Sequence, residues 1–208
     1  ALLPEAGFIT EEGSATYQDE PYCWVIDPLD GTTNYIHDEA PYCVCIALRS
    51  RTELLLGVVY EVCRDECFCA WRGGRAFMNG EEIHVSGVRD IKDAFVFAEL
   101  PYNAQQYKQT ALHLIDKLYG VVGGIRMNGS AAAAICYVAM GRFDAWAEAF
   151  LGKWDYSAAA LIVQEAGGKV TNFYGEDHFI EGHHILATNG NLHPFFQKLL
   201  AEVPPLNM

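Results

Sequence analysis

The chain has 208 residues, of which 51% are hydrophobic and 20% charged, and its formal net charge is −13. That length and apolar content fit a single well-cored domain, whereas a nucleic-acid surface needs clustered Lys and Arg, so we expect no nucleic-acid partner. No apolar run approaches the length of a membrane span, so we expect no membrane contact either.

Three acidic residues near the start of the chain follow short apolar runs. None of the first 48 residues is Lys or Arg, but nine are Asp or Glu, most of which we interpret as a solvated acidic face. Glu11 differs because it follows the strand-like run 7–10. Asp27 and Asp30 differ because they lie just past the strand-like run 24–26.

The middle of the chain reads as strands, and the second half reads as alternating helices and strands. Val, Leu, Cys and aromatic residues predict the strands, and apolar residues at helical spacing that stop at Gly or Pro predict the helices. The predicted strands are 41–49, 54–63, 66–72, 94–99, 143–149, 169–173 and 184–188, and the predicted helices are 104–119, 130–140, 154–166 and 191–202. This order predicts an α/β layered sandwich: one domain over residues 1–208, with two lobes that meet near residue 125.

Seven cysteines are an odd number in a chain long enough to fold without disulfides. We interpret them as small buried thiols in a reducing compartment, and the expected location is cytoplasmic. A zinc site made of Cys63, Cys67 and Cys69 is the alternative, although its spacing lacks paired C-x-x-C knuckles.

Asp27 and Asp30 carry the strongest chemical signal in the sequence. Two carboxylates three residues apart cannot both be buried as bare anions, so they need a cation or must take up protons. Gly31 and two hydroxyl residues follow directly, and such a turn can present backbone N–H groups to a phosphate beside a divalent metal.

Asp155 is a third candidate ligand, because it lies at the start of the predicted helix 154–166. A simple helix cap explains a lone Asp there equally well. Taken with Glu11 and the Asp27–Asp30 pair, however, it gives a set of oxygen ligands at the ends of apolar elements. Mg²⁺ prefers such ligands, and it keeps waters that leave room for a phosphate.

Two other interpretations of Asp27-Pro-Leu-Asp-Gly-Thr compete with a magnesium site. A calcium loop of the EF-hand type needs oxygen ligands at the third and fifth positions and glycine at the sixth, where the chain has Leu29, Gly31 and Thr32. The haloacid dehalogenase superfamily uses Asp-x-Asp-Gly-Thr, with one residue between its acids instead of two. The first alternative fails, and the second stays as a minor one.

Two motifs give the sequence a resemblance to the inositol monophosphatase family of Mg²⁺-dependent phosphatases. The first is Trp24-Val-Ile-Asp-Pro-Leu-Asp-Gly-Thr-Thr-Asn-Tyr, and the second is Trp154-Asp155 followed by a helix that ends Gln-Glu-Ala-Gly-Gly. Phe8-Ile-Thr-Glu-Glu and Gly129-Ser-Ala-Ala agree as well, so the similarity covers nearly the whole chain. The two motifs in this order are specific.

The resemblance implies the fold of the inositol monophosphatase and fructose bisphosphatase type, and it assigns roles to individual residues. The implied catalytic residues are Glu11 and Thr32; the implied ligands of two or three Mg²⁺ ions are Glu11, Asp27, the Leu29 carbonyl, Asp30 and Asp155; and the implied substrate-binding residues are Asp30, Gly31, Thr32, Ala131, Glu148 and Asp155. Without the resemblance, Ala131 is only a small residue at a helix start. The resemblance also implies a homodimer and sensitivity to lithium.

The implied reaction is hydrolysis of myo-inositol monophosphate to inositol and phosphate by a metal-activated water, with no covalent enzyme intermediate. Thr33-Asn34 after Gly-Thr resembles the branch of the family that acts on inositol phosphates, which implies this phosphorylated polyol as the substrate. Alternative substrates are 3′-phosphoadenosine 5′-phosphate and fructose 1,6-bisphosphate, and a non-catalytic metal- or phosphate-binding relative is a further alternative. Family members usually carry about sixty further residues before the Glu11 motif, whose helices and hairpin would cover a face of the core. In the family that section holds an aspartate that supports the threonine corresponding to Thr32, and we expect this chain to lack it.

Overall fold

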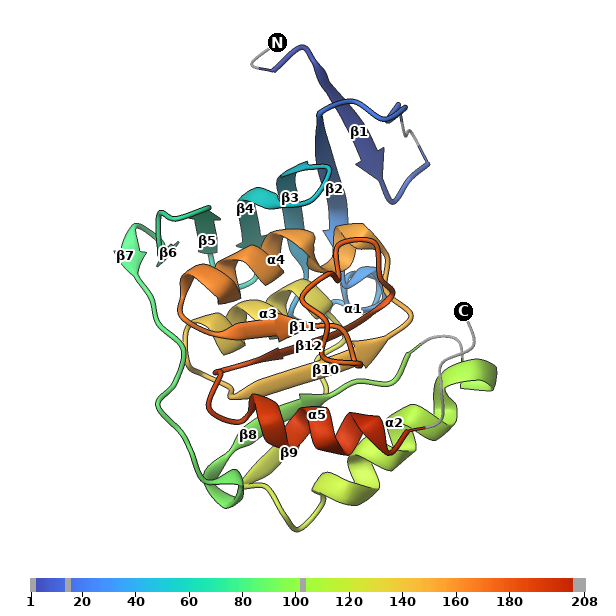
Figure 1. The fold of residues 1–208 in the computed structure, drawn as a ribbon, viewed down its shortest axis with the longest axis vertical. Coiled ribbons are helices and arrows are strands. Elements are labelled where there is room, and N and C mark those ends of the chain that lie inside the picture. The colour runs from blue at the N-terminus through green and yellow to red at the C-terminus, as the bar shows by residue number, and fades with distance from the viewer. Residues whose placement is uncertain (1–2, 14–15, 102–103, 204–208) are drawn as a thin grey trace.

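The computed structural model describes residues 3–13, 16–101 and 104–203, which form two β-sheets with helices between and outside them (Figure 1). The first sheet contains β1 (Ala6–Thr10), β2 (Tyr22–Asp30), β3 (Cys43–Ser50), β4 (Leu54–Glu61), β5 (Glu66–Trp71), β6 (Ala76–Met78) and β7 (Glu81–Glu82), in chain order. Only its β1–β2 pair is parallel, and the other neighbours are antiparallel.

The second sheet has five strands in the order β11-β12-β10-β8-β9. They are β8 (Phe95–Ala98), β9 (Gly124–Arg126), β10 (Ala145–Ala149), β11 (Lys169–Thr171) and β12 (His184–Thr188). β8 is parallel to both of its neighbours, β9 and β10, so the carboxyl ends of these strands lie at one edge of the sheet. The chain passes from the first sheet to the second between β7 and β8, so the lobe boundary expected near residue 125 falls inside the second sheet, at β9.

Five α-helices complete the described part of the chain: α1 (Thr32–Ile36), α2 (Ala104–Leu118), α3 (Ala131–Ala139), α4 (Lys153–Glu165) and α5 (His193–Ala201). A single 3-10 turn, Ile91–Asp93, precedes β8. Figure 1 shows α3 and α4 between the two sheets, and α2 and α5 on the outer face of the second sheet. None of the helices in the described ranges is both long and apolar enough to cross a membrane.

Alternating side chains on β10 and β12 divide the core into two parts. Trp146 and Ile185 face α3, α4 and the first sheet, whereas Ala147 and Leu186 face α2 and α5. Every residue of α3 is buried because small Ala side chains let this helix lie between two sheets. α4 approaches the first sheet closely at Gly57, where a Cβ atom would lie 2.4 Å from the carbonyl oxygen of Ala158.

The layered α/β architecture predicted from the sequence is therefore confirmed, and most predicted elements begin and end within two residues of the observed ones. The helix α1 and the strands β6, β7 and β9 were not predicted, because each has five residues or fewer and too few positions to show a period. One placement was wrong: Asp27 and Asp30 do not follow a strand but belong to it, since β2 continues to Asp30.

Candidate metal centre and active site

A bulge in β2 brings Asp27 and Asp30 to the same side of the first sheet. Cys23, Val25 and Asp27 alternate toward the interior, as the period of a strand requires. Three residues further on, a regular strand would direct a side chain to the opposite face. The pairing with β3 shifts between Asp27 and Asp30, and Asp30 is buried as well.

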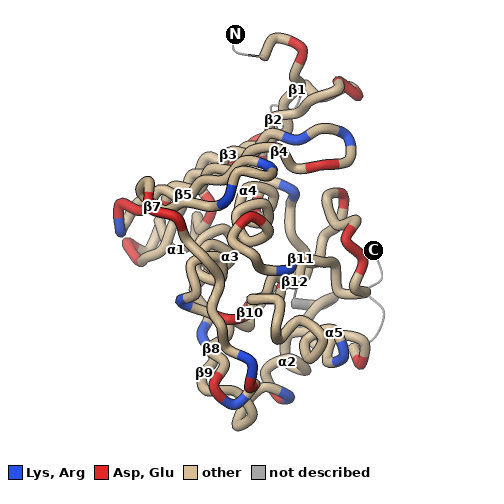
Figure 2. The backbone as a smooth tube through the Cα atoms, turned by 60° about the vertical axis from the view of Figure 1, so that its left-hand side comes forward, with Lys and Arg blue, Asp and Glu red and all other residues tan. Residues whose placement is uncertain are grey.

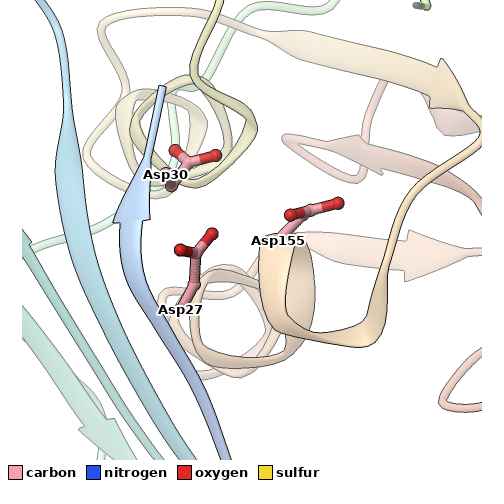
Figure 3. A group of neighbouring side chains, drawn as sticks. All are labelled: Asp27, Asp30 and Asp155. Carbon is pink, nitrogen blue, oxygen red and sulfur yellow. The ribbon is translucent and has the colours of Figure 1, made fainter. Parts of the chain in front are cut away.

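Asp155 reaches the same place from the first turn of α4. Figure 3 shows the Asp27, Asp30 and Asp155 carboxylates in the space between β2 and the start of this helix. One oxygen from each lies within 4.8 Å of one from each of the others. The Gly152 N–H donates to Asp155 Oδ2 at 2.7 Å, which holds the carboxylate at the positive end of the helix. Asp155 is the third residue of α4, and its carboxylate caps the N-terminus through the bond from Gly152, the N-cap residue.

Burial raises the pKa values of all three carboxyl groups, and neighbouring carboxylates raise them further. The pKa of Asp27 rises to about 8, because the group is buried and lies near Asp30, Glu11 and Asp155. Burial, with Asp30 nearby, raises the pKa of Asp155 to about 7. Burial raises the pKa of Asp30 to about 6, and hydrogen bonds from Ser130 and Ala132 limit the rise. A divalent cation among these oxygens would remove the repulsion, so the donor set fits Mg²⁺.

A cavity of about 560 Å³ opens beside the three aspartates. Every residue to which the family resemblance assigned a role lines it, although these residues lie on or next to β1, β2, α1, α3, β10 and α4. These lining residues are Glu11, Asp27, Leu29, Asp30, Gly31, Thr32, Ala131, Glu148 and Asp155. Glu11 follows β1 and its N–H donates to the Ile26 carbonyl at 3.4 Å, which fixes it next to Asp27.

The turn after Asp30 is built for close approach. Leu29 N–H donates to Asp27 Oδ1 at 2.8 Å, and Thr32 Oγ1 donates to the Leu29 carbonyl at 2.9 Å. Gly31 has a φ of 83°, and a Cβ atom at this position would lie 2.9 Å from the carbonyl oxygen of Pro41. Glycine is therefore required here, and the backbone of Gly31 and Thr32 borders the cavity.

The start of α3 holds Asp30 in place. Ser130 caps the helix by accepting from Ala133 N–H at 3.3 Å, and its hydroxyl donates to Asp30 Oδ2. Ala132 N–H donates to the same oxygen at 3.2 Å. Ala131 lies between these two residues at the cavity wall, so the wall and the aspartate are fixed by one helix end.

Sequence reasoning missed Glu99, which follows β8 and lines the cavity. It is 7% exposed, and its carboxylate accepts from Asn128 N–H at 3.1 Å. Burial raises the pKa of Glu99, and burial together with Glu99 raises that of Glu148. An acid directly after a strand whose carboxyl end borders the site was the available signal. Leu100, Phe150 and His183 also line the cavity, and no motif marked them, whereas Trp154, which lines it too, belongs to the second motif.

The structure does not favour the zinc alternative. All seven cysteines are free, and Cys63 is exposed whereas Cys67 and Cys69 are partly buried. Within residues 3–13, 16–101 and 104–203, the one group of His, Cys, Asp and Glu side chains with metal-binding spacing is the aspartate triad. The expectation of buried thiols is confirmed for Cys23, Cys43, Cys45 and Cys136 and is wrong for the other three.

Comparisons with known proteins agree with this geometry. Residues 1–204 match the inositol monophosphatase family. The Nus factor SuhB of Pseudomonas aeruginosa is 41% identical over 203 residues, which are 97% of this chain and 72% of that protein. The inositol-1-monophosphatase of Mesorhizobium japonicum is 35% identical over 187 residues, 89% of this chain and 70% of that one. The solved inositol monophosphatase structure from Anabaena superimposes with a TM-score of 0.92 at 34% identity, covering 99% of this chain and 82% of that one.

Proposed function

The chain belongs to the inositol monophosphatase family, and from that premise we propose that it is a Mg²⁺-dependent phosphomonoesterase that releases phosphate from myo-inositol monophosphate. One observation carries the proposal: oxygens of Asp27, Asp30 and Asp155 lie within 4.8 Å of one another at the wall of a cavity of about 560 Å³. Three carboxylates in such a space suit a phosphate ester only when cations offset their charge.

Asp27, Asp30 and Asp155, together with Glu11 and the Leu29 carbonyl, would hold two or three Mg²⁺ ions. When bound, these ions would offset the charge of the phosphate and of the departing alkoxide and would lower the pKa of a water. These are the ligands that the family resemblance implies. The shared cavity supports them, because all five residues line it.

The chain's own groups would orient the water and the phosphate. The Thr32 hydroxyl donates a hydrogen bond to the Leu29 carbonyl, which leaves the lone pairs of Oγ1 free to accept a hydrogen bond from the water. Glu11, exposed at the end of β1, would accept the proton that the water loses, and the water oxygen would attack phosphorus as the bond to the alcohol oxygen breaks. The N–H groups of Gly31 and Thr32 would hold the phosphate.

A polyol suits the remaining wall of the cavity. Carboxylates accept hydrogen bonds from hydroxyl groups, and Asp30, Glu148 and Asp155 present such acceptors around one space. The Ala131 backbone at the α3 start would accompany them. This arrangement supports an alcohol with neighbouring hydroxyl groups and is the reason for choosing inositol monophosphate.

Phosphate release from a panel of substrates tests the proposal. The panel contains myo-inositol 1-phosphate, 3′-phosphoadenosine 5′-phosphate and fructose 1,6-bisphosphate, each with Mg²⁺ and with a chelator. The expected result is Mg²⁺-dependent release that is fastest with the inositol ester. If release were fastest from the nucleotide or the sugar bisphosphate, that compound would be the substrate instead of the inositol ester. No release from any of them would overturn the enzyme assignment. Lithium sensitivity and a homodimer stay predictions.

A role without catalysis is the second candidate, because the 41% identical relative is named a Nus factor. Figure 2 shows Lys and Arg spread singly over many elements rather than gathered in one patch. The net charge of −13 therefore favours a role that does not depend on direct nucleic-acid contact. Loss of hydrolysis in Asp27→Asn without loss of such a role would separate the two functions.

A further inference from the structure

Phe150 adopts a backbone conformation that a bulky residue rarely accepts. Its φ is 66°, in the left-handed region where a side chain other than Gly, Asn or Asp is strained. Such strain persists only where neighbouring contacts hold it, and it gathers at functional sites. The position is therefore a candidate for a role in binding.

The backbone around Phe150 is fixed on both sides. Ala149 pairs with His184 across β10 and β12. Leu151 N–H donates to the His183 carbonyl at 2.9 Å, and His183 Nδ1 lies 2.9 Å from the Leu151 carbonyl oxygen. This clamp holds the strained backbone conformation and so fixes where the Phe150 side chain begins at the cavity wall.

Packing in the core does not account for the ring. Phe150 is 50% exposed, and its recorded ring contact is a tilted one with Tyr107 at 5.5 Å between centroids. The residue nevertheless lines the cavity that contains the aspartates. An exposed aromatic side chain at a cavity wall, held by a strained backbone, has surface available for a ligand.

Leu100 repeats the pattern on the neighbouring strand. β8 and β10 are parallel, with Ala98 opposite Ala147. Glu99 follows Ala98 and Glu148 follows Ala147. Each carboxylate is followed in turn by an apolar side chain that lines the cavity, Leu100 directly after Glu99 and Phe150 two residues after Glu148. Leu100 is 54% exposed, much like Phe150. The cavity thus has an apolar rim next to its acidic floor.

We propose that Leu100 and Phe150 form an apolar subsite that binds a flat, apolar part of the leaving alcohol, such as an aromatic ring, while the phosphate lies at the aspartates. The inference rests on the proposed phosphomonoesterase function and extends its substrate class beyond polyols. Phe150 is a specificity-determining residue: it contacts the leaving group and not the reacting phosphorus. Binding a ring between apolar surfaces is favourable. Truncating one of these surfaces should therefore lower kcat/KM mainly for substrates that carry the ring.

The test compares benzyl phosphate with glycerol 2-phosphate, two esters of alkyl alcohols of which only the first has a ring. Phe150→Gly removes the phenyl group and keeps the backbone, since glycine adopts positive φ without strain. We expect the ratio of kcat/KM for benzyl phosphate over glycerol 2-phosphate to fall about tenfold in Phe150→Gly and about threefold in Leu100→Ala. Tyr119→Ala is the matched control, because Tyr119 is 82% exposed and lies outside the cavity.

An unchanged ratio in Phe150→Gly would overturn the subsite. Release of phosphate from myo-inositol 1-phosphate without any from benzyl phosphate would also overturn it, while leaving the proposed function intact. Should no ester be hydrolysed, calorimetric titration of the Mg²⁺-loaded protein with benzylphosphonate and methylphosphonate decides the point. Tighter binding of the benzyl compound, lost in Phe150→Gly, supports the subsite; equal or absent binding of the two contradicts it.

Discussion

The hydroxyl of Ser130 donates a hydrogen bond to Oδ2 of Asp30, which lies 100 residues earlier in the chain. The same hydroxyl accepts from Ala133 N–H and so caps α3. One side chain therefore joins a strand of the first sheet to a helix between the sheets and orients a proposed metal ligand at that junction.

Ser130→Ala should reduce both stability and metal affinity. Loss of the helix cap costs roughly 1 kcal/mol of the free energy of unfolding. Loss of the bond to Asp30 should raise the Mg²⁺ concentration for half-maximal phosphate release several-fold. Asp90→Ala is the control, because Asp90 also caps a short helix but lies outside the cavity. Equal Mg²⁺ requirements in the two variants would contradict the orienting role of Ser130.

Asp27→Asn should lower the rate of phosphate release by a factor of roughly 10² to 10⁴, because the substitution replaces a charged ligand of the triad with a neutral amide. The fold should remain intact, since the substitution also removes a buried carboxylate whose pKa is raised to about 8 by burial and repulsion. Circular dichroism and a thermal melt check the fold, and a phosphate assay checks the rate. A near-normal rate would show that Asp27 is not a ligand.

Stability without Mg²⁺ should fall as the pH rises from about 6.5 to about 8. The pKa values of Asp27 and Asp155 are raised to about 8 and about 7, so the folded state retains protons that the unfolded state has lost. More protons bound in the folded state mean less stability at higher pH. His193, with a pKa lowered to about 4 by burial, acts in the opposite direction below its ordinary value of 6.5, which is why the window starts there.

Thermal melts in a chelator across this pH range measure the effect, and the same melts with millimolar Mg²⁺ should show a smaller decline. Asp27→Asn should lessen the decline in the chelator. A melting temperature that rises with pH in the chelator would contradict the crowding of these carboxyl groups.

Gly31→Ala should lower the stability of the fold by more than the backbone strain of the substitution alone. At a φ of 83°, a Cβ atom would also lie 2.9 Å from the Pro41 carbonyl oxygen, so the turn that borders the phosphate position must shift. Gly73→Ala is a matched control, because Gly73 has a φ of 74° and open space around its Cβ position. We expect a loss of about 1 kcal/mol of stability in the control and a larger loss with little activity in Gly31→Ala. An equal loss of stability in the two variants would show that the short distance to the Pro41 carbonyl oxygen does not matter.

The sequence predicted the layered architecture and the candidate site because both depend on local patterns. Apolar periods marked the long elements, carboxylates after apolar runs marked Glu11, Asp27 and Asp30, and a helix start marked Asp155, whereas Ala131 and Glu148 were assigned only by the family resemblance. The bulge that turns Asp30 inward is set by pairing with β3, and no local pattern indicates such a shift.

Glu99 and Phe150 were not predicted for a related reason. Their importance depends on the parallel pairing of β8 with β10, two strands separated by a long stretch of chain, which brings two strand ends to one cavity. The left-handed backbone of Phe150 is likewise imposed by the clamp at His183 and not by its own residue type.

The placement of Asp155 at the first turn of α4 has a mechanical consequence. This helix is sandwiched between the layers, and its partner carboxylates belong to the strand that it lies against. An ion bound there would cross-link the helix to the first sheet. Removing the ion would therefore lower the stability of the fold as well as the rate of the reaction.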